Sequence, residues 1–495
     1  MSTLALETIS SLAPRLERRE VSAVEAVEAA LEQAAAFEPV VHAYITLRAE
    51  AALDAARAAD REIAGGAYRG PLHGVPLAIK DNIAVAGLPT TNGSRLWADH
   101  VTDFDATVVR RLREAGAIVL GKNAMHEWGM GGTCSAMAFG TVRNPWDPEC
   151  VPGGSSGGSA AAVSVGSAAA AIGTDGMGSV RTPASYCGVV GLKPTHGLVS
   201  RFGDLPPTSS WLHDIGTITR DVTDAALVLA AIAGPDPADP SSVTPPEGWT
   251  VGPIPPPADA AGLRVGRLRG WFEADAVPAV LAALDGAATA LTGVGATVVD
   301  VEFPSAADVQ LALLGLMTES QSILLPFALD DPTGFASREI RNRILAAEFV
   351  RAVDVRRALQ LRNRIRRDAR RLMAALDLLL VPSNSTPAFP IGAAGVPVGT
   401  GEETVNLTRP GGQGRLTTRV ATPFSLTGQP AITVPARVGA GELPIGIGLV
   451  ARQWREDILL RAARALEAAT TGGYRPPPLA RSIRATASTS GGGRS

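Results

Sequence analysis

A glycine- and serine-rich stretch, VPGGSSGGSAAA at positions 151–162, is the segment whose residue types most directly suggest chemistry. Four glycines and three serines fill the seven positions 153–159, and alanines follow them. Such runs occur in flexible linkers, in phosphate-binding loops, and in loops that present a nucleophilic serine. These alternatives require different partners elsewhere in the chain, so the remaining sequence can separate them.

Neither a phosphate-binding loop nor a linker fits this stretch. The phosphate-binding pattern G-x-x-x-x-G-K-[ST] needs a lysine after its glycines, and none follows here. The dinucleotide-binding fingerprint G-x-G-x-x-G does not fit either. A linker is disfavoured because an alanine-rich core helix is expected to begin directly after the glycines.

A serine nucleophile is the remaining interpretation, and its base has to be identified. GGSSG satisfies the G-x-S-x-G pattern of α/β-hydrolases with Ser155 at its centre, but that fold places a histidine late in the chain. The chain has six histidines, and the last of them is His213, so none of the residues 214–495 is a histidine. None of the lysines belongs to the S-x-x-K motif of β-lactamases, because none has a serine three positions before it. The sequence therefore favours a serine chemistry with lysine as the base.

Lysine is rare in this chain, which narrows the choice of base. Of 45 basic residues only three are lysines, Lys80, Lys122 and Lys193, and all lie around the glycine-rich stretch. Arginine keeps its proton near neutral pH, whereas a lysine with a lowered pKa can accept one. We expect one of the three to act chemically and the others to pair with carboxylates or cap strands.

Long ordered motifs on both sides of this stretch resemble the amidase signature family. The similarity is dense from about 65 to 235 and returns from about 375 to 467. It is carried by HGVPLAIKDNI, TTNGS, DATVVRRLREAGAIVLGKNAMHEW, FGTVRNPWDPECVPGG, GGSSGGSAAA, GTDGMGSVRTPASYCGVVGLKPTHGLVS, PFSLTGQPAITVPA and LPIGIGLVARQWREDILLRAA. Between these regions only the alternation of elements is similar.

The resemblance implies a Ser–Ser–Lys triad. Lys80 of AIKDN would be the base, Ser155 the bridging serine that follows a cis peptide bond, and Ser179 of GSVRTP the nucleophile. Lys80 would have to be neutral at rest, which requires its pKa to fall by roughly three units from about 10.4. Burial beneath glycine-rich backbone can supply such a shift.

The resemblance also implies the groups that surround the reacting carbonyl. The oxyanion hole would be formed by backbone N–H groups of Gly176, Met177, Gly178 and Ser179. The substrate-binding residues would be Met130, Gly131, Gly132 and Thr133. Asp175 and Arg181 flank the nucleophile, and we expect them to form an ion pair that fixes its loop.

Three positions depart from the family pattern near the expected acyl pocket. Met177 stands where the family usually has glycine, and its side chain would either fill the core or project into the substrate channel. His213 and Thr217 stand where the family commonly has Asp and Pro. Residues 195–214 are the candidate specificity loop. These departures leave the triad positions filled and concern the choice of substrate.

The remaining elements are typical of an α/β fold, with a mixed β-sheet core between two layers of helices. Residues 1–65 are expected to be a helical segment packed on the core, and 66–480 a single amidase signature domain. Residues 235–260 are expected to be a proline-rich excursion, 340–376 an arginine-rich amphipathic helical stretch, and 481–495 a disordered tail.

Composition excludes several classes of partner. The net charge of −3 and the 4% of aromatic residues argue against nucleic-acid binding. There is no signal peptide and no run of about eighteen apolar residues, so we expect a cytoplasmic protein without a membrane partner. Cys134, Cys150 and Cys187 are expected to be reduced, buried thiols. No cofactor is implied, and a monomer or homodimer is expected.

The function predicted from the sequence is hydrolysis of an amide-type C–N bond through a serine acyl-enzyme. Carboxamides, anilides and carbamates (urethanes) present the same carbonyl and nitrogen leaving group, so all three remain open as small-molecule substrates. The alternative is a protein resembling the A subunit of the glutamyl-tRNA(Gln) amidotransferase, which would need partner chains. A binding protein without catalysis is disfavoured because all triad positions are filled.

Removal of metals is expected to leave the hydrolytic rate within about twofold, because the sequence has no His, Cys and carboxylate spacing typical of zinc sites. The initial rate on an amide before and after dialysis against EDTA measures this. A loss of activity that added Zn²⁺ restores would contradict the expectation.

Overall fold

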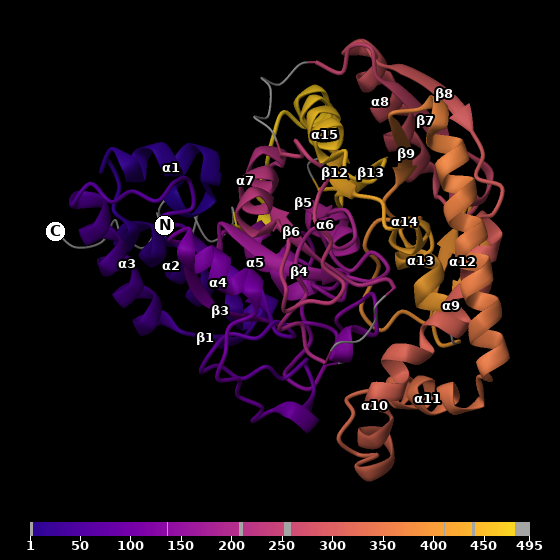
Figure 1. The fold of residues 1–495 in the computed structure, drawn as a ribbon, viewed down its shortest axis with the longest axis horizontal. Coiled ribbons are helices and arrows are strands. Elements are labelled where there is room, and N and C mark those ends of the chain that lie inside the picture. The colour runs from indigo at the N-terminus through magenta and orange to yellow at the C-terminus, as the bar shows by residue number, and fades with distance from the viewer. Residues whose placement is uncertain are drawn as a thin grey trace.

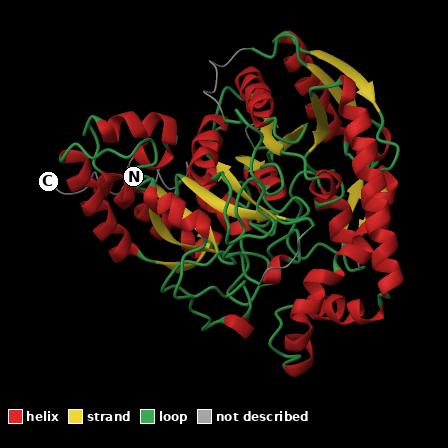
Figure 2. Cartoon of the chain, viewed as in Figure 1, coloured by secondary structure: helices red, strands yellow, loops and turns green. Residues whose placement is uncertain are grey.

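One eleven-stranded sheet forms the centre of the computed structural model, which describes residues 3–135, 137–206, 211–251, 259–409, 411–437 and 441–480. Its strand order is β1-β3-β2-β4-β6-β5-β12-β13-β9-β7-β8. Parallel pairs, such as β2 with β3 and β4, occur beside antiparallel pairs, such as β4 with β6. Helices lie on both sides of the strands (Figure 2). The predicted fold class, a mixed sheet between helical layers, is confirmed.

The strands are short and the helices have ordinary lengths. The strands of the large sheet are β1 Tyr44–Leu47, β2 Pro76–Lys80, β3 Ile118–Asn123, β4 Ala170–Asp175, β5 Val190–Lys193, β6 Asp214–Thr219, β7 Arg264–Leu268, β8 Thr297–Val301, β9 Leu378–Pro382, β12 Ala431–Arg437 and β13 Ile445–Ala451; β10 Gly395–Val398 and β11 Glu403–Asn406 form a separate hairpin. The helices are α1 Ile9–Glu17, α2 Ala23–Val41, α3 Ala49–Ala64, α4 Thr107–Glu114, α5 Gly157–Val165, α6 Arg181–Cys187, α7 Val222–Ile232, α8 Pro278–Gly293, α9 Val309–Leu316, α10 Thr318–Asp330, α11 Arg338–Ala346, α12 Ala352–Leu372, α13 Gly412–Thr417, α14 Thr422–Thr427 and α15 Glu456–Thr470.

The N-terminal helices lie at one end of the molecule and α9 and α12 at the other (Figure 1). Helix α2 is capped by Ser22, whose hydroxyl accepts from the Glu25 N–H while the Glu25 carboxylate accepts from the Ser22 N–H. These two reciprocal bonds form a capping box, which satisfies backbone groups at the start of the helix. The helical prediction for residues 1–65 missed β1, a half-buried strand of four residues that pairs with β3 at the sheet edge. The division of the chain at residue 65 stays a prediction.

The glycine-rich stretch forms a buried loop that leads into α5 at the centre of the fold. Every residue of α5 is buried, and so is every residue of β2 and β4, on which it packs. A Cβ atom at Gly158 would lie 2.4 Å from the Ala124 carbonyl oxygen, so only glycine permits this approach of helix to loop. The small residues of α5 therefore allow this helix to pack closely on β2 and β4, beside the catalytic candidates.

The arginine-rich stretch predicted over 340–376 is divided in two. Helix α11 ends at Ala346, a short turn follows, and α12 begins at Ala352. Most arginines of α12 are exposed, as expected for a solvated face, and Arg362 instead packs over the Trp211 ring at 5.0 Å. Within the proline-rich excursion, the described residues 235–251 form short turns and irregular segments. Residues 252–258 and the tail 481–495 lie outside the described residues.

Residues Ala306–Asp330, which include α9 and α10, are long and apolar enough to cross a membrane by length and composition, with a mean hydropathy of 1.3. No membrane-spanning helix was expected from the sequence at this stretch. Core helices of soluble proteins meet the same criteria, and α9 packs against α12 through Val309, Leu316 and Ile365. The expectation of no membrane partner stays a prediction.

Two glycine substitutions test whether the edge strand β1 is part of the stable sheet. A Cβ at Gly121 of β3 would lie 2.1 Å from the Thr46 carbonyl oxygen, so Gly121→Ala is expected to cost about 1–3 kcal/mol of unfolding free energy. Gly286 is exposed in α8 with no atom within 4 Å of its Cβ position, so Gly286→Ala is expected to gain about 0.5–1 kcal/mol.

The thermal midpoints of both variants and of the unchanged protein measure this difference. The thermal midpoint of Gly121→Ala is expected to lie below that of the unchanged protein, and the midpoint of Gly286→Ala above it. Equal midpoints for Gly121→Ala and the unchanged protein would show that β1 does not pack as described.

Candidate active site

Lys80, the last residue of β2, is fully buried and its ammonium nitrogen is held by oxygen atoms of two residues. Its Nζ lies 2.7 Å from Ser155 Oγ, 2.7 Å from Thr174 Oγ1 and 3.3 Å from the Thr174 carbonyl oxygen. Burial lowers the pKa of Lys80 to about 8, although Cys134, Asp204 and Asp175 act in the opposite direction. The amine can therefore lose its proton in mildly alkaline solution, as a base must.

Ser155 lies between Lys80 and the loop that contains the predicted substrate-binding residues. The Gly154–Ser155 peptide bond is cis, as the family resemblance implies. A Cβ at Gly154 would lie 2.8 Å from the Gly131 carbonyl oxygen and 3.0 Å from the Thr133 nitrogen. The segment Met130–Thr133 thus packs directly on the bridging-serine loop, which places it beside the candidate reaction centre.

Ser179 is partly exposed in the turn between β4 and α6, and a buried ion pair fixes that turn. Both Asp175 oxygens bond Arg181, Oδ2 to Nε and Oδ1 to Nη2, each at 2.9 Å. The same carboxylate accepts from the N–H groups of Gly178 at 2.6 Å and Val180 at 3.2 Å. Burial alone would raise the pKa of Asp175, but the Arg181 guanidinium holds it at about 2. The predicted Asp175–Arg181 pair is confirmed.

Three of the four N–H groups assigned to an oxyanion hole are available for a ligand. Within the described part of the chain, the N–H groups of Gly176, Met177 and Ser179 have no hydrogen-bond acceptor. The Gly178 N–H is already bonded to Asp175. Gly178 itself is needed for the turn, because it has a φ of +111° and its Cβ would lie 2.8 Å from the Ala421 Cβ. The assignment of these groups to an oxyanion hole stays a prediction, with Gly178 in a supporting position.

The nucleophile candidate is tied to the bridging serine through the backbone. The Ser156 N–H donates to the Ser179 carbonyl oxygen at 3.1 Å, so the two loops are adjacent. No direct bond joins Ser155 Oγ to Ser179 Oγ among the described contacts. In unliganded enzymes such catalytic bonds are often long and tighten when substrate binds. The structure therefore brings Lys80 and Ser155 into contact and holds Ser179 beside them.

Met177 and Met130 each contribute to a separate apolar cluster at the edge of the site. Met177 is half-buried and packs against the cluster that contains Leu212 and Phe424. Met130 packs with Trp128 and residues of α10 and α11, and its carbonyl oxygen accepts from Arg343 at 2.7 Å. Contacts with this cluster bury part of the Met177 side chain, and its projection into the substrate channel stays a prediction.

Sequence reasoning missed the polar groups that support the triad candidates. Thr174, adjacent to Asp175 in GTDGMGS, is the second hydroxyl partner of Lys80. Thr182 donates to the Thr417 carbonyl oxygen at 2.5 Å and accepts from Asn384 at 3.2 Å, which ties α6 to segments more than 200 residues away. Position alone could have pointed to Thr174, but no sequence signal pairs Thr182 with Thr417.

The other two lysines have the structural roles expected of them. Lys193 Nζ lies 2.9 Å from Asp214, and Lys122 Nζ lies 3.6 Å from Asp81 and bonds the carbonyl oxygens of Asp81 and Pro89. All three cysteines are free and buried, as predicted. Over the described residues, no three His, Cys, Asp or Glu side chains are arranged to hold a metal ion.

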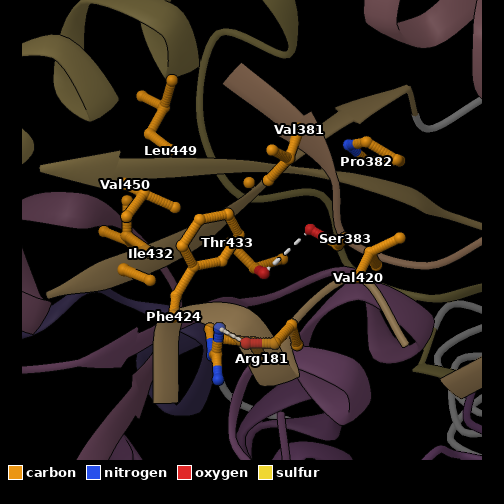
Figure 3. Close-up of a pocket in the computed structure, with 13 residues that line it drawn as sticks. Arg181, Val381, Pro382, Ser383, Val420, Phe424, Ile432, Thr433, Leu449 and Val450 are labelled. Atoms are coloured by element: carbon orange, nitrogen blue, oxygen red, sulfur yellow. Dashed lines mark hydrogen bonds between the residues drawn. The ribbon is translucent and has the colours of Figure 1, made fainter. Parts of the chain in front are cut away.

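A small pocket is lined by Arg181 and by residues of β9, β12, β13 and α14 (Figure 3). Its lining is mostly apolar and includes Phe424 and Val450, and the hydroxyl groups of Ser383 and Thr433 lie 2.8 Å apart in it. None of the triad candidates lines it. Arg181 Nη1 donates to the Ala421 carbonyl oxygen at 3.0 Å. The pocket therefore lies next to the arginine that fixes the nucleophile turn, and not next to the turn itself.

The candidate specificity segment 195–214 has well-packed ends. The Thr195 N–H donates to the buried Glu456 at 2.8 Å, and Leu212 is buried. Positions 207–210 lie outside the described residues. Near its end, the His213 ring lies 3.2 Å from the position that a Gly176 Cβ would occupy. This end of the segment therefore borders the nucleophile turn, whereas the beginning belongs to the core.

Comparison with known proteins gives concordant matches. A family model described as Amidase matches residues 25–460. The A subunit of the glutamyl-tRNA(Gln) amidotransferase from Geobacter metallireducens is 39% identical over 493 residues, which cover 94% of this chain and 97% of that protein. Seven more A subunits are 35–39% identical.

Two solved structures illustrate the similarity of fold. The native peptide amidase from Stenotrophomonas maltophilia has a TM-score of 0.81 at 32% identity, covering 95% of this chain and 98% of that one. A chain from a vestigial protein complex that reveals the evolutionary origins of an s-triazine catabolic enzyme has a TM-score of 0.86 at 32% identity, covering 95% and 100%. At these identities the similarity extends beyond the fold to the sequence.

The reactivity of Ser179 tests the role of Lys80 without any knowledge of the substrate. The rate of Ser179 labelling by a fluorophosphonate probe is expected to rise with pH through a midpoint near 8, where Lys80 loses its proton. Lys80→Arg is expected to lower the rate by a factor of about 10² or more at every pH, because a guanidinium keeps its proton.

Mass spectrometry of the labelled peptide gives the rate at each pH. Lys193→Arg, which keeps a cation beside Asp214, is the matched control and is expected to retain the profile. A flat profile from about pH 5 to 10, or an unimpaired Lys80→Arg variant, would contradict a lysine base.

Proposed function

The chain belongs to the amidase family, and from this premise and the geometry around Lys80 we propose that it hydrolyses amide-type C–N bonds through an acyl-enzyme on Ser179. The observation that carries the proposal is the 2.7 Å bond between Lys80 Nζ and Ser155 Oγ, formed in a buried site where the pKa of the lysine is lowered to about 8. A weak serine nucleophile needs a base of this kind.

The proposed reaction begins with transfer of a proton from Ser179 to Ser155, which passes its own proton to neutral Lys80. Ser179 Oγ forms a bond to the carbonyl carbon, and the resulting oxyanion is stabilised by free N–H groups of the nucleophile turn. The C–N bond then breaks, and the departing amine takes a proton from Lys80 through Ser155. Water cleaves the acyl-enzyme ester by the same relay and releases the acid.

Small amides, anilides and carbamates are the substrates that we assign to a free-standing enzyme. The fold similarity to the peptide amidase of Stenotrophomonas maltophilia supports an amide of modest size. The apolar clusters that Met130 and Met177 contribute to could accommodate an apolar group on either side of the carbonyl. Carbamate cleavage needs no further residue, since it uses the same carbonyl carbon and nitrogen leaving group.

The second candidate function is that of one component of an amidotransferase complex, and the curated relatives favour it over a free-standing amidase. Eight A subunits of glutamyl-tRNA(Gln) amidotransferase are 35–39% identical to this chain, over 92–97% of its length. In that case the same site would cleave an amide donor to release ammonia, and partner chains would replace the expected monomer or homodimer. Both candidates use Ser179 chemistry, so they differ in context rather than in mechanism.

A hydrolysis screen of the purified chain separates these candidates. The substrates are an aliphatic amide, an anilide, an aryl carbamate and glutamine. Turnover of the first three by the chain alone supports a free-standing enzyme, whereas hydrolysis confined to glutamine supports the amidotransferase component.

Ser179→Ala is the matched control for every substrate in the screen. It is expected to lower kcat by a factor of about 10⁴ or more, with the fold unchanged, because it removes one oxygen atom from a partly exposed position. A Ser179→Ala variant that keeps more than about one per cent of the activity would contradict the proposed nucleophile.

A further inference from the structure

A chain of buried hydrogen bonds leads from Lys80 to a carboxylate outside the triad. Thr174 Oγ1, 2.7 Å from Lys80 Nζ, also lies 3.2 Å from Asn82 Nδ2. The same amide nitrogen donates to Asp204 Oδ1 at 2.7 Å. The second Asp204 oxygen lies 2.6 Å from His213 Nδ1. Asn82 thus bridges the hydroxyl partner of the base to Asp204, and His213 fixes the far side of that carboxylate.

The position of Asp204 is set by the fold and not by a strand of its own. Asp204 forms an isolated antiparallel β-bridge with Ile83, which lies shortly after β2. The Ala84 N–H donates to the Gly203 carbonyl oxygen. These contacts hold the loop before β6 against the residues that follow Lys80. The Asp204 side chain is 3% exposed, so its charge is barely screened by solvent.

The charged and titratable groups that face Lys80 differ in how their charge is balanced. They come from four segments: Asp175 at the end of β4, Asp204 in the loop before β6, Cys134 after the substrate-binding segment, and His126 after β3. Asp175 is matched by the Arg181 guanidinium, and burial raises the pKa of the Cys134 thiol to about 11 and lowers that of His126 to about 3, so both stay neutral.

Among the described residues that act on Lys80, Asp204 is therefore the carboxylate without an arginine or lysine in salt-bridge contact. Within the described chain, Asp204 Oδ2 lies 2.6 Å from Nδ1 of the His213 imidazole. From this juxtaposition we propose that Asp204 is a positioning residue for the base: through Asn82 and Thr174 it fixes the orientation of Lys80, and its charge stabilises the protonated amine that forms during Ser179 attack. This inference rests on the proposed function, since it assigns Asp204 a part in the same proton relay.

Two properties of the site follow from this assignment. Without the Asp204 charge the protonated form of Lys80 loses stabilisation, so Lys80 loses its proton at lower pH. Without the Asp204 side chain, Asn82 Nδ2 loses its acceptor at 2.7 Å and no longer holds Thr174 against Lys80. The first effect moves the pH profile, and the second lowers the rate at every pH. Substitution of a residue with only a structural role would not shift the pH midpoint independently of the maximal rate.

The test is the pH profile of fluorophosphonate labelling at Ser179 for Asp204→Asn and Asp204→Ala. Asp204→Asn keeps an acceptor for Asn82 and removes the charge, so its midpoint is expected to fall by roughly one pH unit with a maximal rate within about threefold of the unchanged protein. Asp204→Ala also breaks the chain, and its maximal rate is expected to fall by a factor of about ten or more.

His196→Asn is the matched control. His196 Nδ1 lies 2.7 Å from Asp214 in a comparable His–Asp pair, which is not among the groups that act on Lys80. Its profile is expected to match that of the unchanged protein.

The outcomes separate this inference from the proposed function. An Asp204→Asn midpoint that stays in place or rises, while wild-type Ser179 is labelled normally, would overturn the role of Asp204 alone. Absence of labelling at wild-type Ser179 would overturn the proposed function and this inference with it. Because Asp204→Asn is isosteric, it keeps the test decisive if Asp204→Ala does not fold.

Discussion

The site depends on one constraint, which is that the amine of Lys80 is buried without a carboxylate in contact. Its bonds go to the hydroxyl groups of Ser155 and Thr174 and to one carbonyl oxygen. Burial in such a site lowers the pKa of Lys80 to about 8. This shift corresponds to a free-energy penalty of roughly 3 kcal/mol on the charged form of the amine. Lys193, equally buried, is held by Asp214 at 2.9 Å and is structural. Their different roles follow from the partner that each lysine meets.

The surrounding fold provides this environment by close packing of small residues. Strands β2 and β4 are buried along their whole length, and the glycine-rich loop enters α5 directly above them. At Gly154 the backbone approaches the Gly131 carbonyl oxygen so closely that a Cβ would lie 2.8 Å away. Water is thereby excluded from Lys80, while Ser179, on the turn braced by Asp175 and Arg181, stays partly exposed to substrate. The buried base and the accessible nucleophile are thus built from adjacent loops.

Local signals made the sheet, the triad candidates and the Asp175–Arg181 pair predictable. Alternation of strands and helices gave the α/β class, and lysine scarcity together with the motifs singled out Lys80. The strand order and the edge strand β1 were not predictable, because both depend on contacts between distant segments. The same holds for the Asn82–Asp204–His213 connection, which spans more than 120 residues from Lys80 to its far end. Motifs identify the reacting atoms, whereas the groups that tune them are set by tertiary packing.

The central claim is that Lys80 is uncharged in the resting enzyme at mildly alkaline pH, and nuclear magnetic resonance can measure this directly. Because the chain holds only three lysines, protein labelled with ¹³C and ¹⁵N at lysine gives three side-chain signals, assigned by Lys80→Arg and Lys193→Arg. The account predicts that the Lys80 signal titrates with a midpoint near 8. A Lys80 signal that remains that of a protonated amine to pH 10 would contradict it.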